Sequence, residues 1–227
     1  MSGGPDDKRE IIAELIPADA LEVTTDAHIA LYGATGGEPG IIVIAGTGSI
    51  ALGRDHTKKV ARAGGWGYVF GDEGGAFDIV RQGLRAALRF EEGWGEPTEL
   101  HGALLGETGA ASANELLHWF YRDEWPRSRV AELAPLIGRT AAEGDLIAKG
   151  VLRRAGDSLA NLAAGVRGQL AGDEEYPVAA VGGVFEDPEI LGSFEELVAG
   201  DGDCRLVEPQ ADPATGALLR AIEIAAS

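Results

Sequence analysis

The sequence has little of the chemistry on which several large protein classes depend. One cysteine, Cys204, cannot form an internal disulfide, a cysteine-rich zinc site or a self-contained iron–sulfur cluster. The four histidines show no metal-ligand spacing, so no resident metal site is expected. Basic residues are scarce, since 19 Lys and Arg stand against 37 Asp and Glu and give a net charge of −18. This charge disfavours nucleic acids and membranes as partners, so a bound anion must be held by local N–H groups, hydroxyls and a divalent cation.

Long hydrophobic runs are also lacking. No stretch approaches the roughly 18 apolar residues of a membrane span, and the first ten residues, MSGGPDDKRE, carry charges with no apolar run behind them. Together with the single cysteine, this predicts a cytoplasmic protein. The 227 residues are 45% hydrophobic, which is enough to bury the core of one large domain or two small ones.

The hydrophobic periodicity predicts an α/β fold interrupted by a block of helices. A short helix is expected at 8–16, ended by Pro17, and the helix that begins at 26 is expected to be capped by Asp26. The last helix should be capped by Asp212. Strands are expected at 21–25, 40–46, 50–54, 59–63, 176–185 and 204–209, and further helices at 26–37, 76–92, 113–122, 128–142, 145–170, 187–200 and 212–226.

The turn Gly46-Thr47-Gly48-Ser49 is the first candidate binding element. The stretch GTGSIALG does not match a dinucleotide fingerprint, because its glycine spacing differs and a strand follows it, and it lacks the G-K-[ST] of a phosphate loop. Its glycines and two hydroxyls can nevertheless approach a phosphate closely. An ordinary tight hairpin turn explains the same residues and remains an alternative.

Asp26 is the second candidate, since it follows a predicted strand and begins a helix, where open α/β sheets place their ligands. A carboxylate there can accept the proton of a substrate hydroxyl during phosphoryl transfer. The alternative is that Asp26 only caps its helix.

The stretch ARAGGWGYVFGDEGG, residues 61–75, holds six glycines around Trp66 and Asp72. An indole offers a flat apolar face that stacks on sugar rings, and a carboxylate accepts hydrogen bonds from hydroxyls. A turn and cap for the helix from Ala76 would account for two of these glycines. A fourth, weaker candidate is Gly182-Gly183, where a strand end could let a flat ring lie on the backbone, although a generic turn explains it too.

These stretches resemble, in order and spacing, the N-acetylglucosamine kinase branch of the BadF/BadG/BcrA/BcrD ATPase family, within the actin/hexokinase/Hsp70 superfamily. The resemblance runs from about residue 20 to the C-terminus, and GGWGYVFGDEGGAF is its most specific part. The matching stretches are TTDAHIALYGATGG, GIIVIAGTGSIALGR, GGWGYVFGDEGGAFDIVRQGLRAAL, AVGGVF and PATGALL.

The resemblance implies a ribonuclease H-like (actin-like ATPase) fold in which nucleotide and amino sugar meet between two such domains. It implies that Asp26 is the catalytic base and that Thr47, between Gly46 and Gly48, faces the ATP phosphates. It also implies a nucleoside beside Gly182 and Gly183. The residues implied for the sugar site are Ser49, Gly65, Trp66, Gly67, Tyr68 and Asp72.

The sequence departs from the pattern of such kinases in one respect: it has no glycine-rich D-x-G-G-T hairpin. In these kinases that hairpin holds the β and γ phosphates and helps to place Mg²⁺. We therefore expect residues 1–37 to be the remnant of an N-terminal ribonuclease H-like domain. Residues 38–227 should form the second such domain, with a helical insertion at about 95–170. The strand predicted at 21–25 would then lack its neighbours. The iron–sulfur activase branch is excluded, since Cys204 alone does not supply its ligands.

The expected activity is ATP- and Mg²⁺-dependent phosphorylation of an amino sugar, N-acetylglucosamine to its 6-phosphate, with poor turnover by this chain alone. Two alternatives stay open: a non-catalytic sugar-binding module, and the structural half of a split kinase. The expected partners are a sugar and a nucleotide. Kin are often dimers through the helical domain, so a homodimer is a further alternative.

Overall fold

The computed structural model describes residues 5–16, 18–200 and 202–226. Its strands are β1 (Gly40–Ala45), β2 (Ser49–Arg54), β3 (Val60–Gly64), β4 (Tyr176–Val181) and β5 (Cys204–Val207). Its helices are α1 (Pro5–Leu15), α2 (Asp26–Thr35), α3 (Ala76–Glu91), α4 (Leu100–Thr108), α5 (Ala113–Trp119), α6 (Arg127–Ala131), α7 (Ala134–Ala142), α8 (Leu146–Arg167), the 3₁₀ turn η1 (Gly183–Glu186), α9 (Pro188–Gly200) and α10 (Pro213–Ala225). In the described part of the chain, no helix combines the length and hydrophobicity that crossing a membrane requires.

The five strands form one sheet in the order β3-β2-β1-β4-β5. The first three strands make an antiparallel meander, while β4 and β5 run parallel to β1. The pairs Ile44–Val181 and Ala179–Val207 show that β1, β4 and β5 end at the same edge of the sheet. That edge therefore collects the β1–β2 turn, the start of η1 and the segment that leads into α10.

Strand β1 is buried on both faces, as its continuous apolar run predicts. Ile41 and Val43 face the larger hydrophobic cluster, which includes buried residues of α3, α8 and α9, whereas Ile42 packs with α2 on the other face. Each of these three side chains is 0% exposed. At about 1.5–3 kcal/mol for each buried large aliphatic side chain, this strand anchors both layers of the fold.

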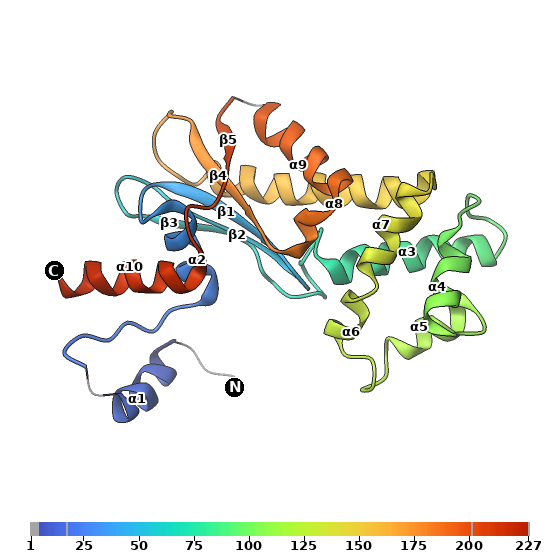
Figure 1. Ribbon diagram of the computed structural model, residues 1–227, viewed down its shortest axis with the longest axis horizontal. Coiled ribbons are helices and arrows are strands. Elements are labelled where there is room, and N and C mark those ends of the chain that lie inside the picture. Colours follow the sequence, from blue (N-terminus) through green and yellow to red (C-terminus); the bar gives the residue numbers. More distant parts are fainter. Residues whose placement is uncertain (1–4, 17, 201, 227) are drawn as a thin grey trace.

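The helical block and the two terminal helices lie at opposite ends of the molecule (Figure 1). The helices α4 to α7 gather at one end, and α1 and α10 lie at the other. The long α8 connects the block to the sheet by burying a stripe at helical spacing that includes Val151, Ala155 and Leu159. Asp145 caps this helix, since its carboxylate accepts a hydrogen bond from the Ala148 N–H at 2.7 Å.

Two predictions at the start of the chain were wrong. Residues 21–25 form no strand, because no other described segment pairs with their backbone. Helix α2 is capped by Thr25 and not by Asp26: the Thr25 hydroxyl accepts from the His28 N–H, while the Asp26 carboxylate accepts from the adjacent Ala27 N–H at 2.8 Å. The predicted stop at Pro17 lies outside the described residues, and α1 ends at Leu15.

Two further differences fall in the helical block. The single helix predicted at 128–142 is two helices, α6 and α7, because Pro135 stands in the first turn of α7 and cannot continue a helix from α6. Helix α4 was not predicted. The strand predicted at 176–185 is too long, because β4 ends at Val181 and the chain turns at Gly182 into the 3₁₀ turn η1. The remaining strands and helices lie where the pattern predicts, with small differences at their ends, and Asp212 caps α10 through the Thr215 N–H at 2.7 Å. The domain boundary at 37 stays a prediction, and α2 packs on the sheet.

Candidate functional site

The tip of the β1–β2 hairpin rests on the start of α3. The carbonyl oxygens of Gly46 and Thr47 accept hydrogen bonds from the backbone N–H groups of Ala76 and Phe77, at 2.8 and 3.1 Å. The first N–H groups of α3 are thus occupied by the hairpin, which holds the tip in one position. The Thr47 side chain is exposed there, as a role at a ligand requires.

Asp72 lies beneath this tip. Its carboxylate packs directly on Gly48, where an added Cβ would meet Oδ1 at 2.7 Å, and Oδ1 lies 3.4 Å from the Ser49 N–H. Asp72 is 6% exposed and has a left-handed backbone with φ of 64°. Such a conformation is rare outside glycine and clusters at functional sites, where the surroundings hold it in place. The Ser49 hydroxyl is also occupied, because it donates to the Glu73 carbonyl at 2.6 Å.

The glycine-rich bend continues from the same hairpin. The Gly65 N–H donates a hydrogen bond to the Ser49 carbonyl at 3.0 Å. The Gly71 N–H donates to the Gly67 carbonyl at 2.8 Å and so closes the bend. The bend presents three aromatic side chains to solvent: Trp66 is 69% exposed, Tyr68 43% and Phe70 83%. The structure therefore links the hairpin tip to the bend through the contacts of the buried Asp72 with Gly48 and Ser49, and the tip and the bend together are called the Thr47 patch.

Arg127, at the start of α6, is a member of this patch that the sequence did not reveal. Its Nη2 donates to Asp72 Oδ2 at 2.8 Å, and its guanidinium lies over the Tyr68 ring at 4.7 Å. The Arg127 Nε is buried without an acceptor among the described residues. The burial of Asp72 calls for some cationic partner. Nothing in the sequence selects an arginine 55 positions away, inside the helical block.

Gly182 and Gly183 follow β4 next to the end of β1. Gly182 has φ of 110°, and an added Cβ would lie 2.9 Å from the Ala45 carbonyl carbon and closer still to its oxygen. Since Ala45 immediately precedes Gly46, the two glycine turns are neighbours at the edge where the parallel strands end. Gly183 has open space around it, which leaves its backbone accessible.

Asp26 reaches this edge from the other face of the sheet. Helix α2 is joined to the start of β1 by residues 36–39 and so runs back along the strand, which directs its first residue toward the end of β1. Ile44 and Ile50, on either side of the hairpin tip, pack against the cluster formed by α2. Asp26 is exposed, and its carboxylate bonds only within its own helix among the described residues. The structure thus places Asp26 toward the same edge but not in contact with the Thr47 patch.

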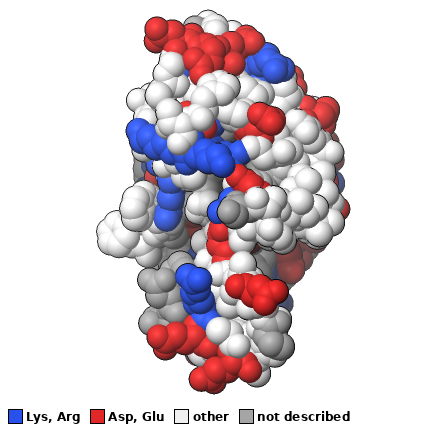
Figure 2. Space-filling view, turned by 90° about the vertical axis from the view of Figure 1, so that its left-hand side faces the viewer, with Lys and Arg blue, Asp and Glu red and all other residues white. Residues whose placement is uncertain are grey.

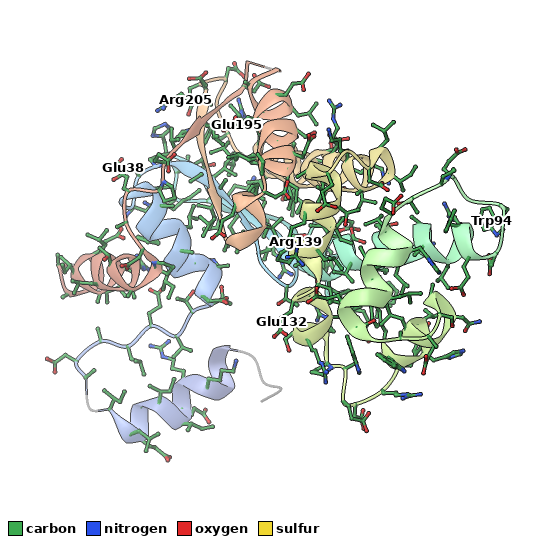
Figure 3. The ribbon with its side chains drawn as sticks, turned by 45° about the vertical axis from the view of Figure 1, so that its right-hand side comes forward. Glu38, Trp94, Glu132, Arg139, Glu195 and Arg205 are labelled. Carbon is green, nitrogen blue, oxygen red and sulfur yellow. The ribbon has the colours of Figure 1, made fainter. Side chains whose placement is uncertain are left out.

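Two cavities lie away from this patch. The first, of about 560 Å³, lies at the opposite edge of the sheet, where β1 and β4 begin. Glu38 and Arg205 line it, far from Trp94 at the tip of the helical block (Figure 3). The other, of about 290 Å³, lies between α2, the β2–β3 turn and α10. Neither of these two cavities is lined by Thr47 or Asp72.

The sequence profile of the BadF/BadG/BcrA/BcrD ATPase family matches residues 4–221 of the chain. The chain belongs to this family. The resemblance read from the glycine-rich bend and the hairpin is therefore confirmed, and it covers the described sheet as well as the helical block.

Two relatives are named as N-acetylglucosamine kinases, the branch of the family that the sequence resembles. The chain is 39% identical over 137 residues to an N-acetylmuramic acid/N-acetylglucosamine kinase of Clostridium acetobutylicum, a match that covers 60% of this chain and 45% of the relative. It is 30% identical over 208 residues to an N-acetyl-D-glucosamine kinase of Dictyostelium discoideum, which covers 88% of this chain and 65% of the relative. The chain thus spans about half to two thirds of the length of these relatives.

Solved structures of sugar kinases share the fold. A crystal structure from Chromobacterium violaceum, assigned as an N-acetylglucosamine kinase, superposes with a TM-score of 0.76 at 32% identity over 96% of this chain and 73% of that one. A ROK family glucokinase from Streptomyces griseus gives a TM-score of 0.51 at 17% identity over 95% of this chain and 71% of that one, which is a likeness of fold alone. The sheet order and these likenesses confirm the ribonuclease H-like fold of the actin-like ATPases.

Proposed function

We propose that the chain carries the amino-sugar and phosphate-binding surfaces of an ATP-dependent kinase that converts N-acetylglucosamine to its 6-phosphate. One observation carries the proposal. The Thr47 hairpin and the Trp66 bend are joined through Asp72 into one patch, in a chain whose relatives are named as kinases of N-acetylglucosamine. We expect the reaction to take place in the cytosol, as the composition predicts.

Each surface of the patch has a distinct role in this proposal. Trp66 and Tyr68 offer exposed aromatic side chains to the sugar ring, and Gly67 leaves open space beside them. Gly65 holds the start of the bend, because its N–H donates to the Ser49 carbonyl and its carbonyl accepts from Arg62. Asp72 and Ser49 support this face from beneath. Both are nearly buried, at 6% and 4% exposure, so they act on the sugar mainly by fixing the bend.

Asp26 is the proposed base. Its carboxylate accepts the proton of the sugar 6-hydroxyl while that oxygen forms a bond to the γ-phosphorus of ATP. The bond between the γ-phosphorus and the bridging oxygen breaks, and ADP leaves with its electron pair. The chain contributes mainly by positioning and charge stabilisation, as in other phosphoryl transfers.

The backbone around the turns fits a nucleotide. Around Gly46 and Gly183 there is open space where a side chain would otherwise stand, so phosphate and nucleoside can approach the main chain near Thr47. Among the described residues no cluster of three or more acidic, His or Cys side chains could hold an ion, so we assign Mg²⁺ to the nucleotide phosphates. When bound, Mg²⁺ neutralises the charge on the transferred group.

Calorimetry of the chain with N-acetylglucosamine and with a non-hydrolysable ATP analogue tests the proposal. Binding of both is expected. Sugar binding alone would favour a non-catalytic sugar-binding module, and binding of neither would remove the proposed function.

The role of Asp26 is tested by steady-state kinetics. Because turnover by this chain alone is expected to be poor, the variant is made in an upstream-extended form, where Asp26→Asn should lower kcat by about 10² to 10⁴ while the dissociation constant for the sugar stays unchanged. Asp19→Asn makes the same change at a nearby exposed position and should have no effect. An unchanged kcat in Asp26→Asn would exclude Asp26 as the base.

A further inference from the structure

The smaller cavity, of about 290 Å³, concentrates positive charge in a chain of net charge −18. Arg54 at the end of β2, Lys58 in the β2–β3 turn and Arg220 of α10 all line it. Figure 2 shows basic side chains gathered on this end of the molecule, between two groups of acidic side chains. The cavity therefore differs in charge from most of the surface around it.

Arg54 is the buried member of this group. It is 7% exposed, its Nη1 donates to the Tyr32 hydroxyl, and its guanidinium lies over the Tyr32 ring at 4.6 Å. Within the described part of the chain no carboxylate comes within 4.0 Å of its nitrogens. Buried arginines are almost always paired with an anion, because removing an unpaired charge from water is costly.

The neighbouring groups do not supply the missing anion. Lys58 pairs with Glu223 at 2.9 Å, and Arg220 pairs with Glu22 at 2.5 Å and with Glu223 at 3.0 Å. Hydrogen bonds from Lys58, Arg220 and Tyr32 lower the pKa of Glu223 to about 2, so this carboxylate is ionised at neutral pH. Three cations against two carboxylates leave one positive charge in excess.

The Tyr32 hydroxyl has no further capacity. It donates its proton to Glu223 Oε2 at 3.0 Å and accepts hydrogen bonds from Arg54 and from Arg220, the latter at 3.2 Å. A hydroxyl has one donor and two acceptor positions, and all three are in use. The Tyr32 hydroxyl therefore cannot accept a further hydrogen bond from the Arg54 guanidinium, which lines the cavity.

We propose that this cavity binds a small oxyanion, a carboxylate or a phosphate group, between Arg54 and Lys58. Its volume matches the lower end of ligand sites, about 300 Å³. Charge-assisted hydrogen bonds from a guanidinium fork suit an anion with two or more acceptor oxygens. The site is distinct from the Thr47 patch, since Arg54 pairs with Gly40 at the start of β1 whereas the hairpin tip follows the end of that strand.

The cavity also borders the start of α2. His28 lines it, and the His28 Nδ1 lies 2.9 Å from the hydroxyl of Thr25, which caps the helix. Burial lowers the pKa of His28 and the charge of Glu22 partly opposes this, so the imidazole is neutral at pH 7. An anion in the cavity favours the imidazolium and should raise this pKa.

Titration of the full chain with inorganic phosphate, and separately with acetate, tests the proposal at constant ionic strength. Amide and His28 signals in NMR spectra should shift saturably, and the His28 pKa should rise in the bound state. Saturation by phosphate alone identifies a phosphate ligand, and saturation by acetate alone identifies a carboxylate ligand.

Lys58→Gln should weaken the binding about five- to tenfold, the effect of one charge-assisted hydrogen bond. Lys59→Gln is the matched control, because it removes the same charge from the same turn. The Lys59 Nζ donates to the Gln169 carbonyl at 2.6 Å, and Lys59 does not line the cavity. Equal weakening by the two variants, or no saturable shift with either anion, would overturn the proposal.

Discussion

Replacing Gly182 by alanine should destabilise the protein far more than the same change at Gly183. Gly182 adopts φ of 110° and ψ of 158°, a combination that is essentially confined to glycine. The new methyl group would also press on the Ala45 carbonyl, whose carbon lies 2.9 Å from the ideal Cβ position. Since Ala45 is 0% exposed and ends β1, it cannot move without disturbing the hairpin that follows.

The magnitude follows from these two costs. Forcing alanine into a sparsely populated backbone region costs about 1–3 kcal/mol, and overpacking at a buried position about 1–3 kcal/mol. The lower entropy of the unfolded alanine chain returns about 0.4–1 kcal/mol. A loss of about 3 kcal/mol in the free energy of unfolding is therefore expected for Gly182→Ala. Gly183 has no positive φ and no atom within 4 Å of an added Cβ, so its variant should change stability by less than about 1 kcal/mol.

Urea denaturation followed by circular dichroism measures the difference. With a slope of about 2 kcal/mol per molar urea, Gly182→Ala should lower the midpoint by about 1.5 M. Binding of the ATP analogue should weaken as well, because the displaced Ala45 precedes the Thr47 turn. If the two alanine variants had the same midpoint, the close approach of β4 to the end of β1 could not be as described.

Two further predictions concern α10. Gly216→Ala would place a methyl group 2.9 Å from the Gly33 Cα, so it should separate α10 from α2 and raise amide hydrogen exchange in both helices; Gly106→Ala, in open space on α4, should leave exchange unchanged or slower. Glu223→Gln should lower the free energy of unfolding at pH 7, because hydrogen bonds from Lys58, Arg220 and Tyr32 hold the folded pKa of Glu223 at about 2. This stabilisation is complete above the unfolded pKa of about 4.3 and is lost as the pH falls toward 2, so urea midpoints of variant and parent should converge on acidification; a constant difference from pH 7 to pH 2.5 would contradict the assignment.

The strands could be predicted from the sequence wherever burial alone determines them. The run GIIVIA has apolar residues on both faces, which only a central strand with helices above and below can bury, and β1 is that strand. Residues 21–25, LEVTT, are also rich in β-branched residues, yet they form no strand in the structure. Strand propensity reports how well a residue fits a sheet, and it has no effect where no neighbouring strand is available.

The order of the strands could not be derived from local patterns. Strand β4 pairs with β1 although 130 residues, including the helical block, separate Ala45 from Tyr176. No periodicity records a pairing over that distance, and the resemblance to a known family was needed to predict the fold. The break between α6 and α7 could have been predicted locally, because Pro135 disfavours a helix through the residues before it. The apolar spacing continues across Pro135 and predicts a single helix instead.

Part of the candidate site could be predicted from the sequence and part could not. The glycine-rich bend and the Thr47 turn are continuous in sequence with the strands that carry them, so their proximity follows from a short meander. The exposure of Trp66 and the burial of Asp72 did not follow, because both occur in the same bend and only the tertiary packing separates them. The position of Asp26 at a strand end rested on a strand that the structure does not contain.

The contact between Asp72 and Arg127 joins the glycine-rich bend to the helical block, across 55 positions of the sequence. Asp72 fixes the hairpin through Gly48 and Ser49, and its second oxygen is held by a residue at the start of α6. A small movement of α6 would therefore displace the Asp72 carboxylate beneath the Trp66 bend. A ligand that binds to this bend would in turn displace α6. The Arg127 side chain is 38% exposed and that of Asp72 9%, so the ion pair lies at the boundary between core and solvent, and the Arg127 Nε has no protein acceptor among the described residues. This contact connects the helical block to the surface on which we propose that the sugar binds.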